Sequence, residues 1–262
     1  EAMLDAVGVP CITQHVASAT RVCTTLLSPD VDGGTEVIEP SGIVASDEVD
    51  ALADAIEERL ADFSGVALCG SSPPGAEGLY DKVVSRLGAC DACTLLLDGV
   101  KQVEEVLSSG RLDVLKLNLM EVKALSRTES AAAAAELLFA EDGALRRRGA
   151  VLAITDGPRP ALLFSSAQLA WRLHVPAVAC VNAIGAGDVC TAIFLYELVR
   201  ARCRSCQAGE TLDEVEAGAQ AADAFAWGLA AASARCGHEK PTFEREEVEE
   251  LRASIRIERL HV

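Results

Sequence analysis

The spacing of apolar residues changes along the chain, from a helical period to short continuous runs. After Ser46, apolar residues recur every three or four positions as far as Phe63, with Asp47 and Glu48 in the first turn, where the helix dipole favours acids. This pattern predicts an amphipathic helix. Short apolar runs that end in turn residues predict buried strands. The chain contains such runs at GVALCG (65–70), TLLLD (94–98), DVLKLN (113–118) and AVLAITDG (150–157).

The segments between these runs have helical character. Helices are predicted near residues 77–88 and 101–108, and helical sequence continues after residue 118 through about 147. Strands that alternate with helices form βαβ units. We therefore expect an α/β fold with a mainly parallel central sheet.

Residues 8–45 follow a different pattern. The segments VPCITQHV (9–16), TRVCTTLL (20–27) and TEVIE (35–39) predict successive strands with no helix between them. The sequence contains no linker, repeat or second core. We therefore expect one domain, in which residues 1–45 form β-rich edge strands and residues 46–262 form the α/β core.

Composition and charge narrow the class of protein. The chain has 262 residues, of which 50% are hydrophobic, enough to bury a sizeable core. Its net charge of −17 argues against a nucleic-acid or anionic-membrane partner, because either would require a basic surface. The apolar stretch that begins at Ala131 is broken by Glu136 and is too short to span a bilayer, and no signal segment opens the chain. We expect a soluble cytoplasmic protein. Because the chain starts at Glu1 and not at Met, we interpret it as a fragment or a processed product.

Most of the ten cysteines are expected to be reduced, since a chain with its own core does not need a disulfide scaffold. Four lie in apolar runs, where a thiol behaves as a small hydrophobic group: Cys23, Cys69, Cys180 and Cys190. Two pairs have metal-ligand spacing: Cys90 with Cys93, and Cys203 with Cys206. Because the pairs are far apart along the chain, we predict that they do not share a zinc ion.

Polar and glycine-rich residues follow the predicted strands. They are GSSPPG (70–75), KLNLME (116–121), TDGP (155–158) and GAGD (185–188). In open parallel sheets, ligands bind at the edge where the carboxyl ends of the strands meet. Gly185 and Gly187 precede an apolar helix, and a helix N-terminus attracts anions. The sequence thus predicts an anion-binding edge.

These segments together resemble the ribokinase-like, or PfkB, carbohydrate kinases, most closely the branch of tagatose-6-phosphate kinase and 1-phosphofructokinase. NAIGAGD (182–188) is similar to the family's most specific motif, and GSSPPG and KLNLMEV resemble its GSLPPG and KPN-x-x-E segments. The segments ATRVCTTL and TEVIE resemble its lid strands. The resemblance implies a three-layer α/β sandwich with a mainly parallel sheet and a small β lid, of which residues 1–45 are a remnant. Family members also have a strand, a helix and a GGKG-x-N segment for which no counterpart precedes Glu1, so we expect an incomplete sugar side.

The resemblance also implies roles for individual residues in a kinase that uses ATP and Mg²⁺. Asp188 is the expected general base that takes a proton from the sugar hydroxyl, and the N–H groups of Gly185, Ala186 and Gly187 form the anion hole. The remaining roles are ATP binding by Lys116, Asn118, Glu121, Thr155 and Gly157, Mg²⁺ binding through water by Asn118 and Glu121, and binding of the sugar phosphate by Arg21 and Ser71. Two copies are expected to pair through the β lid.

Other interpretations of the same residues stay open at this point. Asp188 fits a helix N-cap, Asn118 with Glu121 fits a capping box, and Arg21 fits an exposed strand residue. At the level of function, the alternatives are a kinase of a free sugar or nucleoside, and a truncated module that binds a sugar or nucleotide without catalysis.

Overall fold

The computed structural model describes residues 2–27, 34–88 and 93–261. Contacts divide the chain into two compact units. The first comprises Glu1–Phe63 and Ser71–Cys90, and the second comprises Ser64–Gly70 and Asp91–Val262. Each unit has its own sheet, so the two are described in turn. The domain division expected from the sequence, between residues 45 and 46, stays a prediction.

In the first unit, β1 (Cys23–Leu27) and β2 (Gly34–Ile38) confirm the strands predicted at 20–27 and 35–39, and they pair as a two-stranded antiparallel sheet. Helix α1 (Ala2–Asp5) precedes them. The predicted strand at 9–16 is wrong, because this segment has no regular structure and most of it is exposed. A strand requires backbone hydrogen bonds with a neighbouring strand, and Pro10 cannot donate such a bond because it has no N–H.

The helices of the first unit are α2 (Ser46–Glu57) and α3 (Leu79–Leu87), with a 3-10 turn at Leu60–Asp62. Both helices confirm predictions, although α2 ends before Phe63. Ion pairs join them: Lys82 with Asp50, and Arg86 with Asp54 and Glu57.

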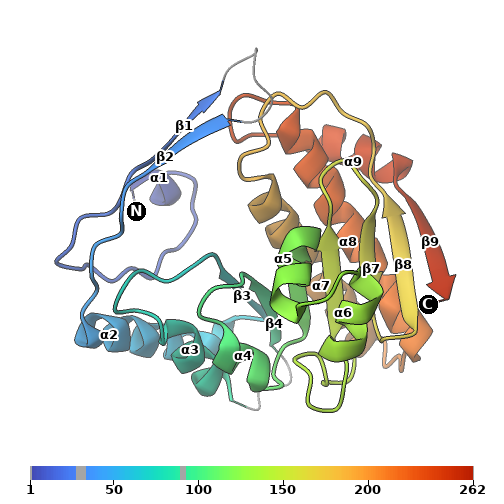
Figure 1. The fold of residues 1–262 in the computed structure, drawn as a ribbon, viewed down its shortest axis with the longest axis horizontal. Coiled ribbons are helices and arrows are strands. Elements are labelled where there is room, and N and C mark those ends of the chain that lie inside the picture. Colours follow the sequence, from blue (N-terminus) through green and yellow to red (C-terminus); the bar gives the residue numbers. More distant parts are fainter. Residues whose placement is uncertain (1, 28–33, 89–92, 262) are drawn as a thin grey trace. The chain divides into compact units, whose positions relative to one another are not determined.

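The second unit is built on a seven-stranded sheet in the described part of the chain, with each strand beside the next one in sequence (Figure 1). Its parallel strands coincide with the predicted apolar runs: β3 (Gly65–Cys69), β4 (Thr94–Asp98), β5 (Val114–Asn118) and β6 (Val151–Thr155). Antiparallel strands extend the sheet beyond β6: β7 (Ala161–Phe164), β8 (Leu169–His174) and β9 (Arg256–His261). The sequence analysis did not place these three.

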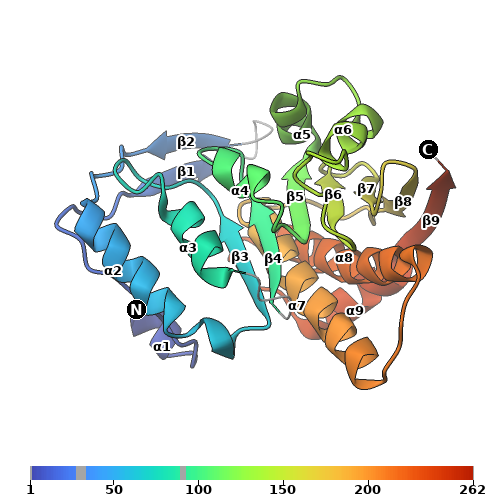
Figure 2. The ribbon, with the colours of Figure 1, turned by 90° about the horizontal axis from the view of Figure 1, so that it is seen from below.

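Helices cover both faces of this sheet and give the second unit three layers (Figure 2). One face carries α4 (Glu104–Ser108), α5 (Leu119–Ser126) and α6 (Ala131–Leu138). The other carries α7 (Ala186–Gln207), α8 (Glu214–Cys236) and α9 (Arg245–Ser254). None of the helices in the described part of the chain combines the length and apolar character that a membrane crossing requires.

The helical sequence predicted through about 147 is interrupted in the structure. Helix α5 ends where Arg127 adopts a left-handed conformation with a φ of 55°. Ser130 then starts α6 by accepting a hydrogen bond from the N–H of Ala133 at 3.1 Å. After Leu138 the chain proceeds through turns. A further difference concerns α4, which begins at Glu104 and not near residue 101 as predicted. The helical spacing of apolar residues continues across these breaks, because it reflects which side chains are buried and does not mark where a helix is capped.

The packing of α7 on α8 fixes the helix that starts with the GAGD motif. The rings of Phe194 and Phe225 meet with their centroids 5.0 Å apart. At Gly228 the helices approach so closely that an added Cβ would lie 2.6 Å from the carbonyl oxygen of Cys190 and 3.1 Å from the Cβ of Phe194. Glycine is therefore required at this crossing.

Replacing Gly228 with alanine is expected to lower the free energy of unfolding by roughly 1–3 kcal/mol, because the methyl group overpacks the crossing. Denaturant unfolding measures the change. Gly78→Ala is the control: Gly78 has a φ of −87° and open space where a Cβ would project. Equal losses in the two variants would contradict the close approach of α7 and α8.

Candidate active site

The carboxyl ends of the four parallel strands form one edge of the sheet in the second unit. Cys69 at the end of β3 pairs with Asp98 at the end of β4, and Asn118 at the end of β5 pairs with Thr155 at the end of β6. Helix α7 starts at this edge, since the Thr191 hydroxyl in its second turn donates a hydrogen bond to the Asp98 carboxylate. The structure therefore brings the predicted polar segments of the second unit to one edge.

The start of α7 has free backbone donors. Its N-cap is Gly185, with a φ of 79° that favours glycine, and Asp188 is exposed in the first turn. The interpretation of Asp188 as the N-cap is thus wrong. Of the three N–H groups predicted for the anion hole, that of Ala186 already donates to the carbonyl of Ala183 at 3.1 Å. Those of Gly185 and Gly187, and also that of Asp188, have no acceptor among the described residues.

Space for a ligand lies beside these donors. A Cβ added to Gly185 or Gly187 would meet no atom within 4 Å. An anion can therefore approach the exposed N–H groups, where the dipole of a long helix adds partial positive charge.

A polar cluster behind this helix start was missed by the sequence analysis. The Lys116 ammonium lies 2.9 Å from the Asp98 carboxylate, and its side chain is 4% exposed. The same carboxylate accepts the hydrogen bond from Thr191. Asp98 therefore ties β4, β5 and α7 together. The available signal was its position as the polar last residue of the apolar run TLLLD.

Cys69 reports the electrostatics of this edge. Burial, followed by the nearby carboxylates of Asp98 and Asp188, raises the pKa of its thiol to about 11, while Lys116 acts in the opposite direction. Cys69 nevertheless remains exposed to solvent, as do Cys23 and Cys180, although all three lie in apolar runs of the sequence. Only Cys190 of those four cysteines is buried. Apolar neighbours in sequence do not bury a residue at a strand end or in a connection.

Asn118 and Glu121 form a capping box. The side chain of Asn118 accepts from the N–H of Glu121 at 2.9 Å, and the side chain of Glu121 accepts from the N–H of Asn118 at 2.9 Å. This arrangement starts α5 at the edge of the sheet and fixes both side chains there. Each keeps one further polar atom outside the box, so capping does not exhaust their ability to bind a ligand.

The connection that leads into α7 is pinned by side chains that the sequence analysis did not single out. Asn182 accepts from the N–H of Ile184 and donates to the carbonyl of Glu239, both at 3.0 Å. The buried Arg235 donates to the carbonyls of Asn182 at 3.2 Å and His238 at 2.9 Å. These bonds hold the residues before Gly185 against the end of α8.

A model of the pfkB family carbohydrate kinases matches residues 1–247. The chain belongs to this family. The predicted family and the ribokinase-like α/β fold are confirmed, and membership makes the protein a carbohydrate kinase. No sequence among the curated proteins matches this PfkB kinase.

Solved structures share the fold of this PfkB kinase at low sequence identity. Phosphofructokinase-2 from Escherichia coli, in complex with potassium, has a TM-score of 0.74 at 18% identity and is matched over 96% of this chain and 76% of its own. A possible 1-phosphofructokinase from Thermotoga maritima has a TM-score of 0.65 at 16% identity, over 92% and 71%. Ribokinase from Giardia lamblia has a TM-score of 0.72 at 16% identity, over 95% and 76%.

Two predicted site residues of the PfkB kinase belong to its first unit. Arg21 is exposed immediately before Val22, whose N–H donates to the Glu39 carboxylate at 2.9 Å. Ser71 is exposed at the start of the connection to α3. Asp188 and the strand ends of the edge belong to the second unit.

The nucleotide-side residues Thr155 and Gly157 lie where β6 ends in a turn. Asp156 between them accepts a hydrogen bond from Arg159 at 2.6 Å, and this bond lowers the pKa of Asp156. The Asp156 carboxylate is thus bonded within the turn and stabilises it.

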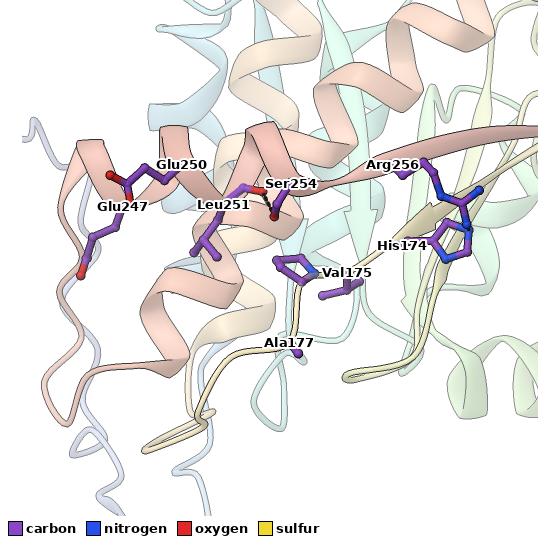
Figure 3. A pocket seen from close by; sticks show the side chains of 9 residues that line it. His174, Val175, Ala177, Glu247, Glu250, Leu251, Ser254 and Arg256 are labelled. Carbon is purple, nitrogen blue, oxygen red and sulfur yellow. Dashed lines mark hydrogen bonds between the residues drawn. The ribbon is translucent and has the colours of Figure 1, made fainter.

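A separate hollow of about 870 Å³ lies between α9 and the end of β8 (Figure 3). His174 and Arg256 point toward each other there, with their nitrogens 2.8 Å apart, and Ser254 donates to the carbonyl of Leu251 at 2.7 Å. The residues that line the hollow include none of the predicted site residues, all of which are described. The hollow is therefore not the candidate active site.

The structure describes three of the four cysteines that have metal-ligand spacing. Cys90 lies outside the described residues, whereas Cys93 is buried and Cys203 and Cys206 are exposed near the end of α7. The prediction that the pairs do not share a zinc ion stays a prediction.

The effect of the Asp188 charge on the Cys69 thiol can be tested by measuring how fast the thiol is alkylated. Below a pKa of about 11, the alkylation rate of Cys69 follows its thiolate fraction and rises about tenfold per pH unit. Asp188→Asn removes a negative charge that raises this pKa, so alkylation at a fixed pH should become roughly two- to threefold faster. Peptide mass spectrometry after timed iodoacetamide treatment measures the rate.

Asp142→Asn is the matched control, since Asp142 is exposed in the connection that leads into β6, at the opposite edge of the sheet. It should leave the Cys69 rate unchanged. An unchanged rate in Asp188→Asn as well would separate Asp188 from the edge where Cys69 lies.

Proposed function

We propose that this PfkB kinase transfers the γ-phosphoryl group of ATP to a hydroxyl of a sugar phosphate, with Asp188 as the general base. The observation that carries the proposal is the exposed Asp188 carboxylate beside free N–H groups at the start of a 22-residue helix. Family membership supports a sugar as acceptor. A structural neighbour, E. coli phosphofructokinase-2, was solved in complex with fructose-6-phosphate, and this favours a phosphorylated sugar as the acceptor.

The proposed chemistry requires an anion site and a proton acceptor at one place. The hydroxyl of the acceptor loses its proton as it attacks, and the Asp188 carboxylate takes this proton. The N–H groups of Gly185, Gly187 and Asp188, together with the helix dipole, stabilise the negative charge on the group in transfer. The proposed donors differ from the expected set because they include the N–H of Asp188 and omit that of Ala186, which is bonded to the carbonyl of Ala183.

Lys116 has an indirect part in this proposal. Its ammonium is buried and paired with Asp98, so it neutralises a carboxylate that would otherwise repel the phosphates from this edge. Removal of one partner would leave a buried charge without compensation. Each of the two buried groups therefore depends on the other.

The residues on the nucleotide side fit ATP and Mg²⁺. Mg²⁺ prefers oxygen ligands and retains several waters. The capping box leaves the second carboxylate oxygen of Glu121 outside it, and the amide oxygen of Asn118, which accepts one bond in the box, has a second lone pair. We propose that these side chains hold Mg²⁺ through water, and that the turn at Thr155 and Gly157 contacts the nucleotide. Bound Mg²⁺ supplies neutralisation of the phosphate charge.

On the sugar side, we propose that Arg21 binds the phosphate already present on the substrate and that Ser71 contacts the sugar. A guanidinium can bind a phosphate through two parallel hydrogen bonds, and Arg21 is exposed in the unit that contains β1 and β2.

We further propose that two copies pair through the sheet formed by β1 and β2. An isolated two-stranded sheet is marginally stable. Leu26 and Val37 lie on one face of it and are 58% and 56% exposed, while Ile38 on the other face is 55% exposed. E. coli phosphofructokinase-2, a structural neighbour, has a tetrameric inhibited form. Apolar surface on both faces supports an association that covers it.

Asp188→Asn is expected to lower turnover by roughly 10²- to 10⁴-fold, since the variant lacks the proton acceptor. ATP affinity should stay nearly unchanged, because the carboxylate contributes little to binding in the ground state. Steady-state kinetics with a hexose phosphate and equilibrium binding of ATP measure the two effects. Asp142→Asn, which removes a distant exposed carboxylate, is the control. Near-normal turnover in Asp188→Asn would overturn the role of general base.

Arg21→Ala tests the class of acceptor. Loss of a charged, two-bond contact of about 1.5–3 kcal/mol should raise the KM for a hexose phosphate roughly 10- to 100-fold. The KM for a free hexose should hardly change, because it has no phosphate to bind. Arg59→Ala is a control in the same unit, as Arg59 is exposed and paired with Asp62 at 2.6 Å. Equal losses for both sugars would favour a kinase of unphosphorylated sugars.

A further inference from the structure

Two cysteines meet where the connection into α7 crosses the end of α8. Cys236 is the last residue of α8, and Cys180 lies in the connection between β8 and α7, five residues before Gly185. The N–H groups of Val181 and Asn182 both donate to the carbonyl of Cys236, at 2.8 and 3.1 Å. The two residues that directly follow Cys180 are therefore hydrogen-bonded to the backbone of Cys236, although 56 positions separate the two cysteines in sequence.

The two thiols also interact with each other. Burial, the charge on a neighbouring Cys180 thiolate and a hydrogen bond between the two side chains all raise the pKa of Cys236. Cys180 is exposed, whereas Cys236 is half-buried. The pair thus combines a thiol that solvent reaches with a shielded thiol directly beside it.

We propose that Cys180 and Cys236 are a modification site, at which a peroxide converts the two thiols into a reversible disulfide. The hydrogen bonds from Val181 and Asn182 to the Cys236 carbonyl hold the chain next to Cys236, and the hydrogen bond between the two thiols places the sulfurs beside each other, as a disulfide requires. The exposure of Cys180 makes it the thiol that the oxidant attacks first.

The chemistry balances in two steps. Hydrogen peroxide oxidises the Cys180 thiol to a sulfenic acid and is itself reduced, with loss of its second oxygen as water. The Cys236 sulfur then attacks the Cys180 sulfur, the S–S bond forms, and the sulfenic oxygen leaves as a second water that carries the thiol proton. A dithiol reverses the reaction by exchange and is oxidised in turn.

The disulfide would tie down the connection that carries the anion-binding residues. Val181 and Asn182 follow Cys180 directly, and their N–H groups are hydrogen-bonded to Cys236. A covalent link at this point keeps these hydrogen bonds closed, since the connection can no longer separate from α8. Exchange of the two backbone amides with solvent should therefore slow in the oxidised protein.

The test begins with native protein treated with hydrogen peroxide, after which the remaining thiols are blocked with N-ethylmaleimide. Proteolysis and mass spectrometry should then find a peptide pair joined through Cys180 and Cys236, with the loss of two hydrogen atoms, as the main oxidised species. Dithiothreitol should restore both thiols. Hydrogen exchange should show slower exchange at residues 181 and 182 in the oxidised form.

Cys180→Ser removes the exposed partner, and after the same treatment Cys236 should remain available to N-ethylmaleimide. Cys203→Ser, which replaces an exposed cysteine on α7, should form the Cys180–Cys236 link as the native protein does. Circular dichroism verifies that each variant is folded. The proposal is overturned if native protein keeps both thiols after peroxide treatment, if its main oxidised species lacks the Cys180–Cys236 link, or if exchange at residues 181 and 182 is the same in both forms.

Discussion

The position of the start of α7 at the carboxyl edge of the parallel strands is the constraint on which the candidate site depends. Asp98 at the end of β4 accepts a hydrogen bond from Thr191 on α7 and pairs with Lys116 on β5. Two strands and one helix thereby meet at a single carboxylate. The close crossing of α7 and α8 at Gly228 holds the same helix from its other side. Because the helix cannot slide along the sheet, its free N–H groups and Asp188 stay beside the polar strand ends.

An acidic protein that binds phosphates requires a local source of positive potential. The net charge of the chain is −17, yet the edge at α7 concentrates partial positive charge at the helix start. Lys116 cancels the charge of Asp98. Arg235 is 2% exposed and pairs with no carboxylate in the described part of the chain, and it donates to the carbonyls of Asn182 and His238. A buried cation thus lies behind the connection that presents the anion site, where solvent screens it least.

The same connection shows how one short segment can serve several purposes. Residues 180–185 join a sheet strand to a helix, and they present the free donors at Gly185 and Gly187. Their contacts with α8 come mainly from backbone groups and from Asn182. With the proposed oxidation, the cysteine on each side of these contacts would add a covalent link that a peroxide forms and a dithiol breaks. Catalytic geometry and redox chemistry would then act on one set of hydrogen bonds.

The sequence by itself determined the parallel half of the sheet and the motif at the start of α7. The strands TLLLD and VLKLN are each buried at four of five positions because helices cover both faces, and each carries three apolar residues. Such runs can be recognised without knowing which strands they pair with. The glycines of GAGD likewise act through their own backbone. Local pattern does not record which groups meet across the fold. The segment expected as a strand at 9–16 belongs to neither of the described sheets, and β9 depends on a pairing with β8 that joins residues as far apart as Leu169 and His261. The contacts of Asp98 with Lys116 and of Cys180 with Cys236 join residues far apart in sequence, so only the tertiary structure decided them.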